Sequence, residues 1–123
     1  MIMARSTCRE RYIGVDVATD GSLIVAERED GHRAGTLHFE AGDSGLAALR
    51  AHLAAQHAKP HVCVRACGAA ALAVALGLTS LPGAEVTLVA ARSLEPRRAG
   101  VAMTPANADE RAEQLARRAE RLF

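Results

Sequence analysis

The stretch RYIGVDVATDGSLIVA, residues 11–26, decides the fold of this 123-residue chain. A run of β-branched and aromatic residues, an Asp-Gly pair and a second apolar run predict two antiparallel strands joined by a tight turn. We place these strands at 11–18 and 22–28. A second Asp-Gly pair leads into a third strand at 33–39, so the chain is expected to open with an antiparallel meander.

Helices and strands alternate in the rest of the sequence. Leu46, Leu49 and Leu53 have the three-to-four spacing of a helix that ends before Pro60. The apolar run at 85–90 predicts a strand buried on both faces. The remaining predicted elements are a strand at 61–66, an alanine-rich helix at 69–78 and a final helix that begins at Asn107.

The expected order is βββαβαβα, an α/β fold with a mixed five-stranded sheet and helices packed against it. Crossovers between parallel strands are nearly always right-handed, and this order is that of the ribonuclease H-like fold. We expect residues 1–9 to be a disordered leader and residues 10–123 to form a single domain.

Composition narrows the class of protein. The formal net charge of +1 gives no sign of a strongly polyanionic partner. No apolar stretch approaches the ~20 residues that span a bilayer, and the first residues lack the apolar core of a signal peptide. The three cysteines show no disulfide pattern. We therefore expect a cytoplasmic protein with no membrane partner.

Asp16 is the first candidate functional residue. It lies in the middle of the first strand, between Val15 and Val17. Burying an ionised carboxylate without a partner is costly, so either Asp16 faces an open surface or a cation meets it.

Several short motifs occur in the order typical of one family. Together they resemble the amino-terminal, RuvC-like domain of the DEDD transposases, the insertion-sequence-110 family that includes the Piv and MooV recombinases. The motifs are Gly14-Val15-Asp16-Val17, Gly45-Leu46-Ala47-Ala48-Leu49, Arg65-Ala66-Cys67-Gly68 and the helix start at 106–112. The family also carries a carboxy-terminal domain, so the resemblance implies either an excised fragment or a truncated, degenerate descendant, and the replaced acids favour the descendant.

The resemblance also implies a changed site. In the family, four carboxylates hold divalent metal ions for phosphodiester chemistry. Here only Asp16 falls on such a position, because Arg65 stands for the expected glutamate, and Ala108 and Arg111 align with the two helix aspartates. We expect an Asp16–Arg65 ion pair in place of the metal site. The implied protein has no cofactor and no nuclease activity, and it acts as an interaction or weak DNA-binding module.

An alternative alignment of the last helix retains a metal-dependent catalytic site. If the last helix is shifted by one residue, Asp109 takes the first aspartate position and Glu113 lies one turn further on the same face. Asp16, Asp109 and Glu113 would then form a reduced catalytic site, with Asp16 as a metal ligand. This alternative predicts a Mg²⁺- or Mn²⁺-dependent DNA nuclease or recombinase.

Other residues suggest partners. Arg92, Arg97 and Arg98 are the candidate DNA-binding residues, although a solvated, salt-bridged face also explains the arginines of this region. Helices rich in alanine allow close helix–helix approach, which suggests a homodimer. His52 and His57 on the first predicted helix are expected to be solvated.

Overall fold

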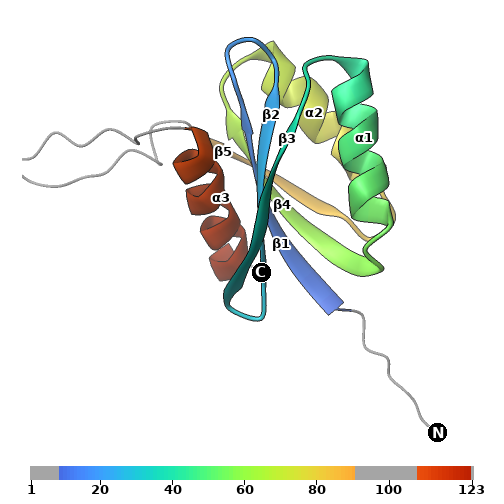
Figure 1. Cartoon of the computed structure of the whole chain (residues 1–123), viewed down its shortest axis with the longest axis vertical. Coiled ribbons are helices and arrows are strands. Elements are labelled where there is room, and N and C mark those ends of the chain that lie inside the picture. The colour runs from blue at the N-terminus through green and yellow to red at the C-terminus, as the bar shows by residue number, and fades with distance from the viewer. Residues whose placement is uncertain (1–8, 91–107, 123) are drawn as a thin grey trace, which may run out of the picture.

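The computed structural model describes residues 9–90 and 108–122 of the chain (Figure 1). Its elements follow the predicted βββαβαβα order. They are β1 (Arg9–Val17), β2 (Leu23–Glu29), β3 (His32–Phe39), α1 (Asp43–Ala54), β4 (Ala58–Ala66), α2 (Ala69–Thr79), β5 (Glu85–Ala90) and α3 (Ala108–Leu122).

The five strands form one mixed sheet in the order β3-β2-β1-β4-β5. The strands β1, β2 and β3 are antiparallel neighbours, whereas β1 and β4 run parallel, as do β4 and β5. The α/β fold with a mixed five-stranded sheet is therefore confirmed. The meander arises as the sequence suggests: Asp30 and Gly31 both have positive φ, 55° and 78°, as a two-residue type I′ turn requires.

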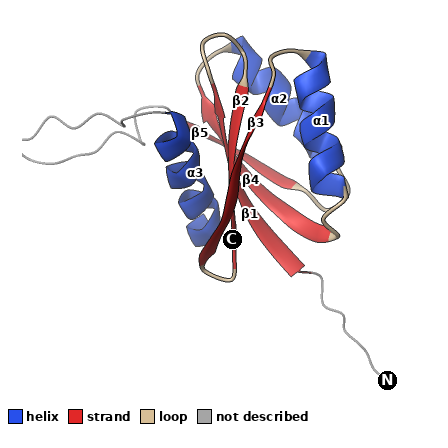
Figure 2. Cartoon of the chain, viewed as in Figure 1, coloured by secondary structure: helices blue, strands red, loops and turns tan. Residues whose placement is uncertain are grey.

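Helices cover both faces of the sheet. Figure 2 shows α3 alone on one face and α1 and α2 on the other. The main apolar core lies on the α1 and α2 face and includes Ile13, Val15, Val17, Leu49 and Leu78. Because side chains alternate along a strand, Gly14 and Asp16 of β1 face α3.

Gly14 lets α3 lie directly on β1. A Cβ atom at this position would stand 2.1 Å from the carbonyl oxygen of Ala112 and 2.4 Å from the backbone nitrogen of Ala116. Ala112 and Ala116 are themselves fully buried and pack against Ile24 and Ala26 of β2. The small residues on both sides thus set the position of α3, and with it the site described below.

Two predicted details are wrong. Arg9, assigned to the disordered leader, is the first residue of β1 and pairs with Ala58 of β4; residues 1–8 lie outside the described part. The strand at 85–90 is not buried on both faces, since Leu88 is 43% exposed. The prediction fails because β5 is the last strand in the described sheet and pairs only with β4 there.

Among residues 9–90 and 108–122, no helix has the length and apolar character needed to cross a membrane.

Candidate functional site

Asp16 lies near the carboxyl end of β1 and its side chain is fully buried beneath α3. The flanking Val15 and Val17 point into the apolar core on the opposite face. A buried carboxylate requires compensation, and the structure provides it from two elements that are far apart in sequence.

Arg65 is the first partner. It is near the carboxyl end of β4, where the parallel register pairs Val15 with Val64, so Arg65 and Asp16, each one residue further along, lie beside each other on the same face. Its Nε donates to Asp16 Oδ1 over 2.5 Å. The structure therefore brings together the pair that the sequence suggested.

Arg111 is the second partner, and sequence reasoning missed it. From the first turn of α3, its Nε lies 3.3 Å from both Asp16 oxygens, and Nη2 also lies 3.3 Å from Oδ2. A signal was present, because Arg111 aligns with a family position that carries a metal-binding aspartate. Two guanidinium groups thus meet one carboxylate.

This arrangement does not fit a metal ion. A divalent cation needs several oxygen ligands of its own, yet both oxygens of Asp16 face cations. The remaining alignment positions of the resemblance supply Arg65, Ala108 and Arg111, none of which offers a side-chain oxygen. In the part of the chain that the structure describes, no three His, Cys, Asp or Glu side chains form a group that could hold a metal.

The residues of the alternative site are not brought to Asp16. Asp109 is 54% exposed, and its carboxylate lies 2.9 Å from His38 Nε2 on β3. The strand β3 is two strands away from β1, which is roughly 10 Å. Glu113 pairs with Arg28 Nη1 at 2.8 Å. Its partner Arg28 is opposite Tyr12 in the register, so the Arg28 backbone lies four residues along the sheet from Asp16, roughly 13 Å.

A cavity of about 440 Å³ adjoins the Asp16 cluster at the carboxyl ends of β1 and β4. Arg65 forms part of its wall, together with the β1–β2 turn and the start of α2. The lining residues are Val17, Ala18, Thr19, Arg65, Cys67, Ala69 and Ala70. Ligands of open α/β sheets commonly bind beyond the carboxyl ends of the strands, so this edge is the candidate site.

A second buried carboxylate lies on the opposite face. Glu27 of β2 accepts from Arg11 Nη2 at 3.1 Å, its Oε2 lies 2.7 Å from His52 Nε2, and Gln56 Nε2 donates to it at 3.1 Å. The expectation that His52 is solvated is thus wrong. It fails because the position of α1 above Glu27 is a tertiary feature that helical spacing does not reveal.

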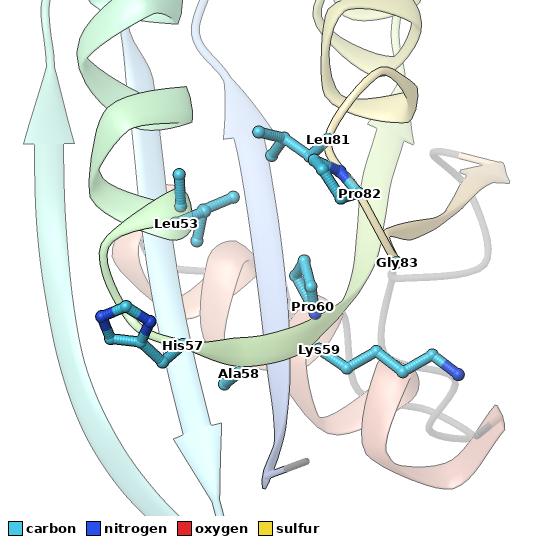
Figure 3. Close-up of a pocket in the computed structure, with 9 residues that line it drawn as sticks. Leu53, His57, Ala58, Lys59, Pro60, Leu81, Pro82 and Gly83 are labelled. Atoms are coloured by element: carbon cyan, nitrogen blue, oxygen red, sulfur yellow. The ribbon is translucent and has the colours of Figure 1, made fainter.

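A further cavity of about 470 Å³ lies at the other end of the sheet (Figure 3). Leu53, Pro60, Leu81 and Pro82 give it an apolar wall. Lys59 extends away from these side chains in Figure 3 and pairs with Glu85 at 3.8 Å. This cavity lacks the converging charges of the Asp16 cluster.

The predicted DNA-binding residues Arg92, Arg97 and Arg98 lie outside the described residues.

Comparison with known proteins adds no assignment. No protein-family model matches the chain, and no curated protein is significantly similar to it.

Proposed function

We propose that this chain is a ribonuclease H-like domain of DEDD transposase type that has lost metal-dependent nuclease activity. It acts in the cytoplasm as an interaction module with weak DNA binding. Cys63 and Cys67, which form no disulfide, agree with a reducing compartment.

One observation carries the proposal: Arg65 and Arg111 both contact Asp16. Each arginine occupies a position where the resemblance expects a carboxylate. A cation in such a position removes a ligand and also repels a divalent ion electrostatically. The two changes therefore act in the same direction, against metal binding.

The topology supports the fold assignment. An antiparallel meander followed by two parallel strands, with an acidic residue on the central β1, agrees with the arrangement that the family resemblance implies. Fold does not determine function, so the chemical argument rests on the arginines.

Calorimetric titration with Mn²⁺ tests the loss of the metal site. We expect no saturable binding at millimolar Mn²⁺ for the wild-type chain, and no cleavage of branched DNA. Saturable binding that Asp16→Asn abolishes would refute the proposal in favour of the reduced site of Asp16, Asp109 and Glu113. The Arg65→Gln and Arg111→Gln variants serve as controls, since a nearby metal site would gain affinity when either cation is removed.

The outer face of α2 supports self-association. Its sequence, AAALAVALGLT, contains no charged residue, and Leu72 and Leu76 are 49% and 62% exposed. Leu72 and Leu76 are one helical turn apart, and so are the exposed Ala69 and Ala73. If two copies of α2 pack about a twofold axis, the leucines of one copy can lie against the alanines of the other. A homodimer through this face would bury the apolar surface that a helix without a polar side leaves in water.

Light scattering over a dilution series tests the homodimer. We expect wild-type dimers to dissociate on dilution and Leu76→Glu to give monomers at every concentration. Leu122→Glu is the matched control, because Leu122 is similarly exposed (54%) but lies on the charged helix α3. A wild-type chain that is monomeric at high concentration would contradict this part of the proposal.

A further inference from the structure

We infer that Arg65, in the wall of the cavity beyond the carboxyl ends of β1 and β4, and Arg111, which shares Asp16 with it, bind the phosphate ester of a nucleotide directly. The inference rests on the proposed function and names its ligand: the arginines contact the phosphate that a metal ion contacts in an active nuclease.

Charge is the first argument. Arg65 and Arg111 together carry two positive charges, and Asp16 carries one negative charge. The cluster therefore has an excess of one positive charge. None of the described residues that line the cavity beside it is an aspartate or a glutamate, so the surplus is available to an anion.

The donors of Arg65 are the second argument. Arg65 contacts Asp16 through Nε, which leaves the two terminal nitrogens of its guanidinium group. Within residues 9–90 and 108–122 these nitrogens make no hydrogen bond. Arg65 is 20% exposed and forms part of the cavity wall. A guanidinium fork held at one nitrogen and open at two is suited to bidentate phosphate contact.

Asp16 positions the donors. Because it is fully buried and contacts both arginines, it fixes each guanidinium group at the same edge of the sheet. Arg111, 26% exposed, uses Nε and Nη2 for Asp16 and retains Nη1. Such preorganisation lowers the entropy lost when a ligand is bound.

The cavity has a suitable size and lining. Its volume of about 440 Å³ falls within the usual range of small-molecule sites, roughly 300–1,000 Å³. The Thr19 hydroxyl and the backbone of Ala69 and Ala70, at the uncapped start of α2, add hydrogen-bond donors to the wall. Together with the Arg65 guanidinium group, these donors suit a phosphate group.

Fluorescence anisotropy with a labelled single-stranded oligonucleotide tests the inference in buffer without divalent ions. We expect Arg65→Gln and Arg111→Gln each to weaken binding about tenfold, the loss of one charge-assisted contact, and to reduce the salt slope by about one. Arg50→Gln is the matched control. Arg50 lies on α1, on the other face of the sheet, and contacts Ser80, so its loss should leave binding unchanged.

Asp16→Asn gives the sharpest result. Asparagine removes the negative charge that competes with a phosphate but keeps one oxygen that can accept from the arginines, so we expect the variant to bind the oligonucleotide severalfold more tightly. A metal-bridged contact predicts the opposite, and weaker binding by a folded Asp16→Asn variant would overturn the inference. Circular dichroism establishes that each variant is folded, and Arg65→Lys, which keeps the charge but not the fork, should lie between wild type and Arg65→Gln.

The remaining outcomes separate this inference from the proposed function. If wild type binds the oligonucleotide and both glutamine variants bind equally well, DNA binding stands and the inference fails. If wild type binds no oligonucleotide, the DNA-binding part of the proposed function fails. A titration with AMP then decides the inference. AMP binding that Arg65→Gln weakens would support the inference, with a free nucleotide as the ligand, whereas a lack of AMP binding would overturn the inference.

Discussion

Asp16 and Glu27 are buried carboxylates on adjacent strands of one sheet, and each is held by arginine, yet their surroundings differ. Glu27 faces α1, where Arg11 contacts both Glu27 and Glu29, and Arg9 contacts Glu29. Two arginines there meet two glutamates. Asp16 faces α3, where two arginines meet one carboxylate beside a cavity.

The difference separates a structural network from a candidate site. The Glu27 network matches two arginines with two glutamates and is completed by His52 of α1 and by Gln56, just beyond the end of α1. Hydrogen bonds of this kind between a helix and a sheet stabilise their contact. The Asp16 cluster keeps a surplus positive charge at the sheet edge where ligands bind, and that surplus has no evident structural purpose.

The largest expected effect comes from Gly14→Ala, which acts on the Asp16 face alone. The new Cβ would overlap the backbone of Ala112 and Ala116, so α3 must move away and carry Arg111 with it. We expect a loss of about 3 kcal/mol or more in the free energy of unfolding, measured by urea denaturation.

Gly77→Ala is the control for Gly14→Ala. Its Cβ would meet only the end of the Leu46 side chain, 2.7 Å from Cδ2, and alanine favours a helix. We expect a change within about 1 kcal/mol in either direction. Equal losses in the two variants would show that α3 does not lie against β1 as closely as described.

The next effect compares the two carboxylates themselves. Asp16→Asn leaves two guanidinium groups facing each other without a counter-charge, whereas Glu27→Gln leaves Arg11 paired with Glu29. We expect losses of about 3 kcal/mol for Asp16→Asn and about 1 kcal/mol for Glu27→Gln, by the same denaturation assay. A larger loss for Glu27→Gln would reverse the assignment of structural and functional roles.

The sequence predicts the elements well because their signals are local. The Asp-Gly turns, the leucine spacing of α1 and the stripe of α3 each depend on residues a few positions apart. The Asp16–Arg65 contact is also predictable, since it follows from placing two motif positions on neighbouring parallel strands. These features need no knowledge of how the helices lie on the sheet.

The contacts that sequence reasoning missed depend on tertiary placement. Arg111 is 95 residues from Asp16, and their contact requires α3 to lie against Gly14. His52 meets Glu27 only because α1 packs on that face of the sheet. The exposure of β5 has the same origin, because an apolar run does not state whether its strand is central or at the end of the sheet.

A smaller effect is expected from His52→Ala, which tests the Glu27 network from the side of α1. Glu27 keeps Arg11 and Gln56 after the substitution, so it loses one partner, while Gln56 and Phe39 lose their contacts with the His52 ring. We expect a decrease of about 1 kcal/mol in the free energy of unfolding. Combining His52→Ala with Glu27→Gln should cost less than the sum of the two; full additivity would argue against a direct contact.

The smallest effect concerns another buried ionisable group, the Cys63 thiol, which lies on the Asp16 face against Leu115 and Ala119. Burial raises the pKa of Cys63 from 9.0 to about 11, although Arg118 opposes the shift. The thiol is therefore neutral in the folded chain at a pH where it ionises in the unfolded chain. The contribution of the neutral thiol to the free energy of unfolding is complete below pH 9.0 and is lost as the pH rises toward about 11.

We expect the free energy of unfolding, measured in reductant at about pH 8 and about pH 10, to fall by about 1 kcal/mol more in wild type than in Cys63→Ala. An equal fall in both proteins would mean that solvent reaches Cys63, and that α3 covers this face less completely than α1 and α2 cover the other.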